Sequence, residues 1–344
     1  MDILTALDRK TDYSKTHLQL ILGAWVVSSL RESKAKISTH DGDVEEGEYD
    51  KRSLYSLLYA LYRSLGEVPS DGGGERYELT FNTWGYAWPK SWGPCPVRPT
   101  DPQRFGKHAY TGLYEFAAAR EHIASKDGRV HIVEMGSGTG AGAHHVCGSV
   151  LPACTYHAVD MQQAAIATCR RKFVPELGGR LAATCADATH LPIADGVADF
   201  VAVNETHVTE HAGQVTDEDR RFFHTAKRLL KPGGHLVWGN AIPTATWDAC
   251  LAYLPTIGLE VREVRDVTPE SIQARDEDKA RIDAYVEHVM STFHGFRIPV
   301  LGTRRRRQAE VALKNFARNP GTRLYQYLCD GTDAYKVVLA QKTA

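Results

Sequence analysis

Residues 130–142 read Val-His-Ile-Val-Glu-Met-Gly-Ser-Gly-Thr-Gly-Ala-Gly, and this stretch decides the fold. A short apolar run that leads directly into clustered glycines predicts a buried strand followed by a tight turn into a helix. Gly136, Gly138 and Gly140 let the backbone approach a ligand closely, because glycine has no Cβ. A dinucleotide site has the spacing GxGxxG, whereas this loop has GxGxG, with Glu134 two residues before the first glycine.

Apolar segments alternate with helix-like segments from residue 129 onward. The five expected strands are Val130–Glu134, Thr155–Asp160, Leu181–Ala186, Asp199–Val203 and His235–Gly239. Such alternation predicts an α/β fold with a Rossmann-like, doubly wound, mostly parallel sheet and right-handed crossovers. We expect Arg323–Leu328 and Ala334–Ala340 to form an antiparallel C-terminal hairpin that completes seven strands.

The 344 residues are expected to form two regions. Residues 1–110 would be a helical and aromatic lid region, because leucines recur at helical spacing in the first 66 residues and an aromatic stretch follows at 81–92. Residues 111–344 would be the core, with a helical insertion at about 262–318. We expect the lid region to close over a site and exclude water. The alternative is that the aromatic side chains only fill the core.

Two carboxylates stand at the ends of consecutive predicted strands. Asp160 ends the second strand, about 20 residues after the glycine loop, where a carboxylate accepts ribose hydroxyls in this topology. Asp187 follows the third strand, where an acid can accept from an adenine amino group. Because the carboxyl ends of parallel strands meet at one edge of a sheet, these residues predict a nucleoside-binding site there.

Together these motifs resemble the class I methyltransferase family over about residues 80–242. The resemblance implies S-adenosylmethionine as the cofactor and no metal. By the family pattern, the glycine loop would hold the methionine part and Asp160 the ribose, while Asn204 would lie beneath the sulfonium. The implied cofactor-binding residues are Glu134, Gly136, Gly138, Gly140, Asp160, Met161, Asp187, Ala188, Asn204 and Tyr86.

Three segments are similar to the phthiotriol dimycocerosate-type O-methyltransferases of lipid and polyketide pathways. They are the lid motif Asn82-Thr-Trp-Gly-Tyr86, the strand end Asn204-Glu-Thr-His207, and the tail from Gly321 to Lys336. This similarity implies natural product biosynthesis, with a small lipophilic hydroxyl or enol as the methyl acceptor. Two alternatives stay open. One is C-methylation of a polyketide or terpene carbon, with tryptophans around a developing cation. The other is a non-methylating cyclase that keeps the cofactor fold.

His207 is the expected general base, because it follows the fourth strand and an imidazole titrates near neutral pH. Glu205 is expected to orient its ring or to contact the acceptor. For His144 and His145, packing or hydration on the helix after the glycine loop is favoured over catalysis.

Two further motifs invite other interpretations. His207-Val-Thr-Glu-His211 matches HxxEH, but a zinc hydrolase needs a third ligand and a different fold context. The run Arg304–Arg307 is typical of a solvated or salt-bridged face, and binding of an anionic substrate group is the alternative.

Composition limits the remaining classes. With 41 basic and 42 acidic side chains, the net charge of -1 does not suggest a nucleic-acid partner. The N-terminus lacks a signal-peptide pattern, and no apolar run approaches ~18 residues, so we expect no membrane span. Seven cysteines without CxxC pairs predict reduced thiols and a cytoplasmic location. The sequence leaves a monomer and a homodimer equally open.

Overall fold

The computed structural model describes residues 81, 83–101, 103–206, 213–294, 310, 313–315 and 317–343. The side chains of 288–294 are not described. The described residues fall into two units, one within 80–276 and 325–344 and the other within 277–324. The larger unit holds the whole sheet. The helices expected in residues 1–66 and the run Arg304–Arg307 lie outside the described residues.

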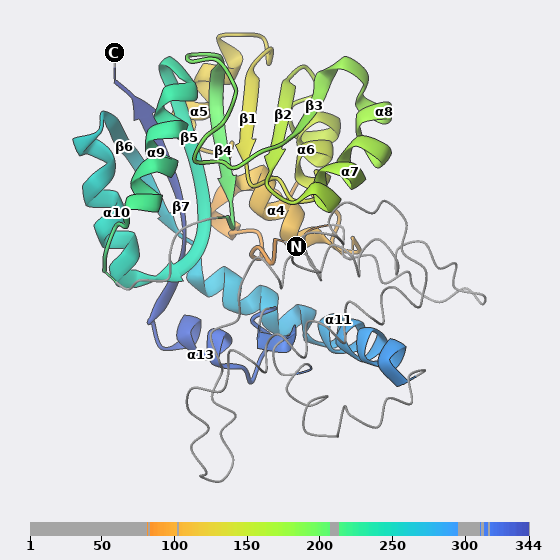
Figure 1. Ribbon diagram of the computed structural model, residues 1–344. Coiled ribbons are helices and arrows are strands. Elements are labelled where there is room, and N and C mark those ends of the chain that lie inside the picture. Colours follow the sequence, from red (N-terminus) through yellow and green to blue (C-terminus); the bar gives the residue numbers. More distant parts are fainter. Residues whose placement is uncertain are drawn as a thin grey trace, which may run out of the picture. The chain divides into compact units, whose positions relative to one another are not determined.

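Seven strands form one sheet in the order β3-β2-β1-β4-β5-β7-β6 (Figure 1). The first five of that order are parallel neighbours, and β7 runs antiparallel to both β5 and β6. The strands are β1 His131–Met135, β2 Thr155–Asp160, β3 Leu181–Cys185, β4 Ala198–Asn204, β5 Leu230–Pro243, β6 Leu259–Asp266 and β7 Asp333–Lys342. The expected Rossmann-like, mostly parallel, seven-stranded sheet is therefore confirmed.

Helices cover both faces of the sheet and bury a separate apolar core on each. On one face, Tyr110 and Leu113 pack with Ile132 and Phe200, and on the other, Phe223 packs with the neighbouring strand residues. Alternate residues of a strand face opposite sides of the sheet. Because helices cover both sides, nearly every residue of a central strand is buried, and the strand reads as a continuous apolar run. The helices are α4 Arg104–Gly112, α5 Ala117–Ala124, α6 Ala141–His145, α7 Gln163–Lys172, α8 Val174–Leu177, α9 Asp217–Leu229, α10 Thr244–Thr256, α11 Thr268–His294 and α13 Arg323–Cys329; the shorter turns are η1 Lys90–Trp92, η2 Val146–Val150 and η3 Gly178–Arg180.

The antiparallel strands are not the hairpin that the sequence suggested. Residues 323–329 form α13, and the partner of β7 is β6, from the region expected to be helical from about 262. Val261 and Val264 are three residues apart in sequence, which is a helical spacing, although Val264 is 40% exposed on the strand. Leu324 and Leu328 of α13 are four apart, but the tyrosines between them favoured a strand. The helical insertion begins at Thr268, after β6.

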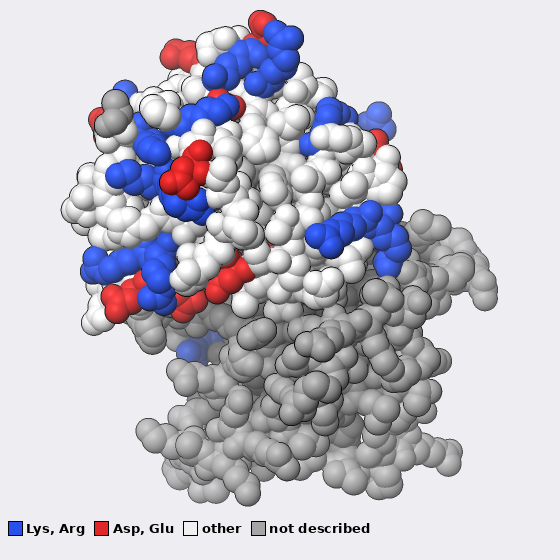
Figure 2. Space-filling view, turned by 45° about the horizontal axis from the view of Figure 1, so that its top comes forward, with Lys and Arg blue, Asp and Glu red and all other residues white. Residues whose placement is uncertain are grey.

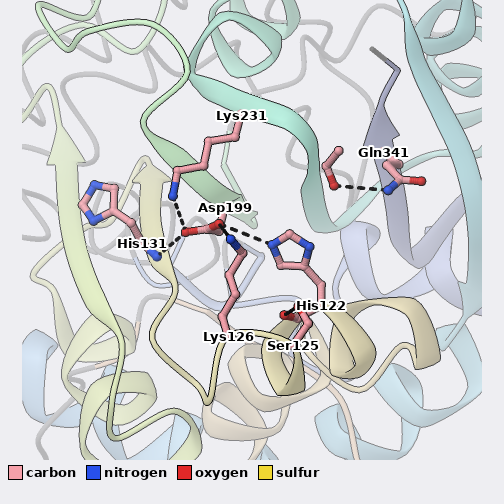
Figure 3. A network of polar contacts seen from close by, with 8 residues as sticks. His122, Ser125, Lys126, His131, Asp199, Lys231 and Gln341 are labelled. Carbon is pink, nitrogen blue, oxygen red and sulfur yellow. Dashed lines mark hydrogen bonds and ion pairs between the residues drawn. The ribbon is translucent and has the colours of Figure 1, made fainter.

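A buried carboxylate ties the amino ends of three strands to α5 (Figure 3). Asp199 of β4 accepts from the backbone N–H of His131 in β1 at 2.9 Å and from Lys231 Nζ in β5 at 2.7 Å. His122 Nε2 of α5 lies 3.4 Å from its other oxygen, and Lys126 Nζ, just after α5, lies 3.3 Å from it. Burial raises the pKa of Asp199, but Lys231, the His131 amide and Lys126 outweigh it and hold the pKa at about 2. The network fixes the register of the strands whose opposite ends carry the site.

The described surface mixes both signs of charge. On the face shown in Figure 2, Lys and Arg lie interspersed with Asp and Glu and with uncharged residues. Of the helices in the described part of the chain, none combines the length and the apolar character needed to cross a membrane.

Candidate active site

The glycine loop turns tightly from β1 into α6. Gly136, Gly138 and Gly140 all have positive φ, at 86°, 55° and 82°. The amides of Gly136 and Ser137 both donate to the Val159 carbonyl at 2.8 Å, which folds the loop back over the end of β2. A Cβ at Gly136 would overlap the Thr206 side chain, and one at Gly140 would overlap Cys169. Backbone conformation favours glycine at all three positions, and space also requires it at Gly136 and Gly140.

Asp160 organises the same edge of the sheet. Its Oδ2 accepts from the Gly138 amide and its Oδ1 from the Gln162 amide, both at 2.8 Å. Burial raises the pKa of Asp160, and these two N–H donors oppose the rise. Each carboxylate oxygen still has acceptor capacity after one hydrogen bond. Asp160 thus links the glycine loop to β2 while it remains able to accept from a ligand hydroxyl.

The residues expected to contact a base follow at the ends of β2 and β3. Met161 is 49% exposed, a high value for a large apolar side chain next to a buried strand. The Ala186 amide donates to the Asp160 carbonyl at 3.0 Å, which brings the chain of Asp187 and Ala188 beside Met161. Asp187 is exposed and accepts from both the amide and the hydroxyl of Thr189 at 2.8 Å. The topology therefore brings Met161, Asp187 and Ala188 to the same edge of the sheet, as the sequence predicted.

Glu134 is wholly buried beneath the loop, and two tyrosine hydroxyls donate hydrogen bonds to its carboxyl group. Tyr110 of α4 donates to one oxygen at 2.9 Å, and Tyr156 of β2 donates to the other at 3.0 Å. Burial raises the pKa of Glu134 to about 7 even though both hydroxyls favour the ionised form. Sequence reasoning missed both tyrosines. The one available signal was Gly142, since a Cβ there would overlap the Tyr110 ring.

Two buried polar side chains at this edge lack partners in the described part of the chain. They are the Asn204 amide, at both its nitrogen and its oxygen, and the Ser137 hydroxyl. Asn204 ends β4, and Ser137 is in the glycine loop, so both belong to the predicted cofactor site. A buried polar group without a hydrogen bond costs about 1–3 kcal/mol. These atoms therefore point to a polar ligand at the carboxyl edge of the sheet.

Glu205 directly follows Asn204 and has the left-handed backbone angle φ 47°. Its carboxylate accepts from the Trp84 amide at 3.0 Å and the Gly85 amide at 2.8 Å. The Tyr335 hydroxyl of β7 donates to it at 2.9 Å. The structure therefore connects Glu205 to the aromatic segment of the chain.

Tyr86 is wholly buried, with its ring edge-on to Trp92 and Tyr335 at centroid distances of 5.9 and 5.3 Å. Its hydroxyl occupies the space that a Gly112 side chain would need. Burial raises the pKa of Tyr86 far above its usual value. The expected contact of Tyr86 with the cofactor stays a prediction.

The expected base, His207, and the second histidine of the HxxEH motif, His211, lie outside the described residues, as does Asn82 of the lid motif. His144 lies 2.8 Å from Glu176 and stacks on a phenylalanine ring. His145 contacts the Thr111 hydroxyl at 3.0 Å, and burial lowers its pKa to about 4. Within the described residues, no group of three or more His, Cys, Asp or Glu is placed to hold a metal ion.

Comparison with known proteins identifies the domain. Residues 133–238 match the model of a methyltransferase domain. A phthiotriol/phenolphthiotriol dimycocerosates methyltransferase of Mycobacterium tuberculosis is 27% identical over 227 residues, which cover 63% of this chain and 77% of the relative. Phthiotriol/phenolphthiotriol dimycocerosates methyltransferase 1 of Mycobacterium ulcerans is 30% identical over 159 residues, or 45% of this chain and 53% of the relative.

Among solved structures, the cyclase SpnF matches with a TM-score of 0.52 and 18% identity, over 76% of this chain and 87% of that chain. This likeness shows the fold. The domain match, the curated relatives, the strand order and the glycine loop with its acidic partners agree with one another. These findings support an S-adenosylmethionine-dependent methyltransferase with a Rossmann-like fold, whose methyltransferase domain includes residues 133–238.

Proposed function

We propose that this enzyme transfers the methyl group of S-adenosylmethionine to an oxygen atom of a small lipophilic molecule, a hydroxyl or enol of polyketide or lipid origin. The observation that carries the methyl-transfer site is that the buried side chains of Asn204 and Ser137, in and beside the glycine loop, have no hydrogen-bond partner among the described residues. The oxygen acceptor is supported by the curated relatives, which are named as methyltransferases of phthiotriol and phenolphthiotriol dimycocerosates.

The residues at the carboxyl edge fit the cofactor. The glycine loop and Ser137 would hold its methionine part, and Asp160 would accept from its ribose hydroxyls. Met161 would cover the adenine, with Asp187 and Ala188 at its rim. Asn204 would lie beneath the sulfur. When bound, the cofactor supplies an electrophilic methyl group on a sulfonium. The protein's contribution is then mainly to hold an acceptor oxygen in line with that methyl group.

An acceptor hydroxyl must lose its proton, and we propose that His207 removes it. The supporting observation is its position, three residues after the end of β4 and close in sequence to Asn204. An imidazole changes charge near neutral pH, which suits a general base. An aliphatic alcohol needs this help more than an acidic enol does. The loss of turnover in a His207 variant should therefore distinguish an alcohol acceptor, with a large loss, from an enol acceptor, with a small one.

Carbon methylation is less well supported by the aromatic segment. A carbon acceptor that develops positive charge would favour open aromatic faces around it. The Arg265 guanidinium already lies 4.8 Å from the Trp92 ring centroid, and Arg275 lies 5.7 Å from the Trp84 centroid. Resident cations thus occupy faces that a carbocation cage would use.

The test is incubation with S-adenosylmethionine that carries a deuterated methyl group, together with a panel of lipophilic alcohols, phenols and enols. We expect S-adenosylhomocysteine and a product with one labelled methyl group, which NMR places on oxygen. A label on carbon would support C-methylation instead. Conversion of the acceptor without any S-adenosylhomocysteine would support a cyclase and overturn the proposal.

A further inference from the structure

Residues 83–87, here called the 83–87 strap, are held through their backbone on two sides. On one side, Glu205 accepts from the amides of Trp84 and Gly85. These two bonds join the strap to the end of β4, immediately after Asn204. The carboxylate accepts from two consecutive amides, which can converge on one acceptor because Gly85 has the left-handed backbone angle φ 62°. A single side chain thus pairs two backbone donors of the strap.

The other side of the strap is fixed by α11 and α4. Ser271 Oγ donates to the Gly85 carbonyl at 3.2 Å, and Arg275 donates to the Trp84 carbonyl. The Ala87 amide donates to the Glu270 carbonyl at 2.9 Å. The His108 ring contacts the Tyr86 carbonyl at 3.0 Å. The strap thus has little freedom as long as its contacts with Glu205 persist.

Glu205 also adjoins the glycine loop through its neighbour. The Thr206 hydroxyl donates to the Gly136 carbonyl at 3.0 Å, and the Glu205 amide donates to the Gly239 carbonyl at 2.8 Å. The left-handed φ of Glu205 costs about 1 kcal/mol or more for a residue with a Cβ. Such a conformation persists only where surrounding contacts require it, and here it turns the carboxylate toward the strap.

We infer that Glu205 is a positioning residue that locks the 83–87 strap against the cofactor edge, and not a group that acts on the acceptor proton. The inference rests on the proposed methyl-transfer site but names a role within it. Its three donors are two backbone amides and the Tyr335 hydroxyl, so about three of its four acceptor sites are committed to the strap and to β7. The acceptor would then meet a preformed wall on this side of the site.

Glu205→Gln is the informative variant, because it keeps the side-chain size. Its amide nitrogen would face a backbone N–H, so at least one strap bond is lost. Tyr335→Phe is the milder second variant, because it removes one donor and leaves both strap amides paired. Glu121→Gln, at an exposed position on α5, is the matched control.

The first measurement is amide hydrogen exchange of the full chain, which requires no methyl transfer. We expect the Trp84 and Gly85 amides to exchange about 10- to 100-fold faster in Glu205→Gln than in the wild type, since hydrogen bonds to a charged group are strong. Tyr335→Phe should produce a smaller increase, and Glu121→Gln none. Unchanged exchange at both amides in Glu205→Gln would overturn the inference, whether or not an acceptor is ever methylated.

The second measurement separates positioning from proton transfer. With a methylated acceptor in hand, Glu205→Gln should lower kcat/KM for the acceptor by about tenfold, through loss of alignment. The pH midpoint of kcat should stay at the wild-type value. A shifted or abolished midpoint, with both strap amides still protected, would show that Glu205 takes part in proton transfer and would overturn the assignment.

Discussion

Glu134→Gln removes the ionisable group beneath the glycine loop and keeps the size and shape of the side chain. In the folded enzyme, burial raises the pKa of Glu134 from 4.5 to about 7, against the opposing hydroxyls of Tyr110 and Tyr156. A raised folded-state pKa contributes stability below the unfolded value, and that contribution is lost as the pH rises through about 7. At pH 6 the empty enzyme should therefore hold a proton on Glu134.

The size of the effect follows from the shift. A change from 4.5 to about 7 disfavours the ionised form by about 3 kcal/mol above pH 7. A cofactor cation next to the carboxyl group favours the ionised form and lowers its pKa. If binding returns the pKa toward its ordinary value, most of the proton that Glu134 holds at pH 6 is released.

Calorimetric titration with S-adenosylmethionine at pH 6, in two buffers of different ionisation enthalpy, measures this release. The wild-type heat should differ between the buffers, and the heat of Glu134→Gln should not. S-adenosylhomocysteine lacks the sulfonium charge and is the matched ligand control, with a smaller difference expected. The same heat in both buffers for the wild type, or the same buffer dependence in Glu134→Gln, would refute the reasoning.

Two more predictions concern stability and turnover. Asp199→Asn should lower the free energy of unfolding by about 2 kcal/mol at pH 7 in urea titrations, because the pKa of Asp199 is lowered from 3.8 to about 2. That contribution is present above pH ~4 and is lost as the pH falls toward 2, so the variant and wild type should converge in acid. Asp195→Asn, at a carboxylate 74% exposed beside Arg228, should cost less than about 1 kcal/mol. His207→Ala should lower turnover on an alcohol by about 10²–10⁴-fold with cofactor affinity unchanged; a wild-type rate would reject His207 as the base.

The positions of the strand-end residues could be predicted because their signals are local. Gly136 follows β1 directly, Asp160 is the last residue of β2, and Asn204 is the last residue of β4. Parallel topology then brings these strand ends together without further information. The hydrogen-bond partners of Glu134 and Glu205 could not be found in this way. Tyr335 is 130 residues from Glu205, and the contact exists only after β7 inserts between β5 and β6.

The outer strands were harder to predict for a different reason. β6 lies at the sheet edge and carries the ion pairs Glu260–Arg262 and Glu263–Arg265, so its composition resembles a charged helix. Charged side chains are common on edge strands, where they discourage pairing with another chain. Burial of only one face leaves a weak apolar signal there, whereas β4 is buried along its whole length and reads clearly as a strand.

Binding of S-adenosylhomocysteine to the wild type and to Asp160→Ala, compared with binding of NAD, tests the cofactor assignment most directly. Calorimetry should show micromolar affinity of the wild type for S-adenosylhomocysteine and a marked preference over NAD. Loss of the carboxylate removes charge-assisted hydrogen bonds of about 1.5–3 kcal/mol each, so Asp160→Ala should bind at least about tenfold more weakly. Circular dichroism of the variant shows whether its fold is retained. Equal affinity of the folded variant and the wild type, or tighter binding of NAD, would contradict a class I methyltransferase site at the carboxyl edge of this sheet.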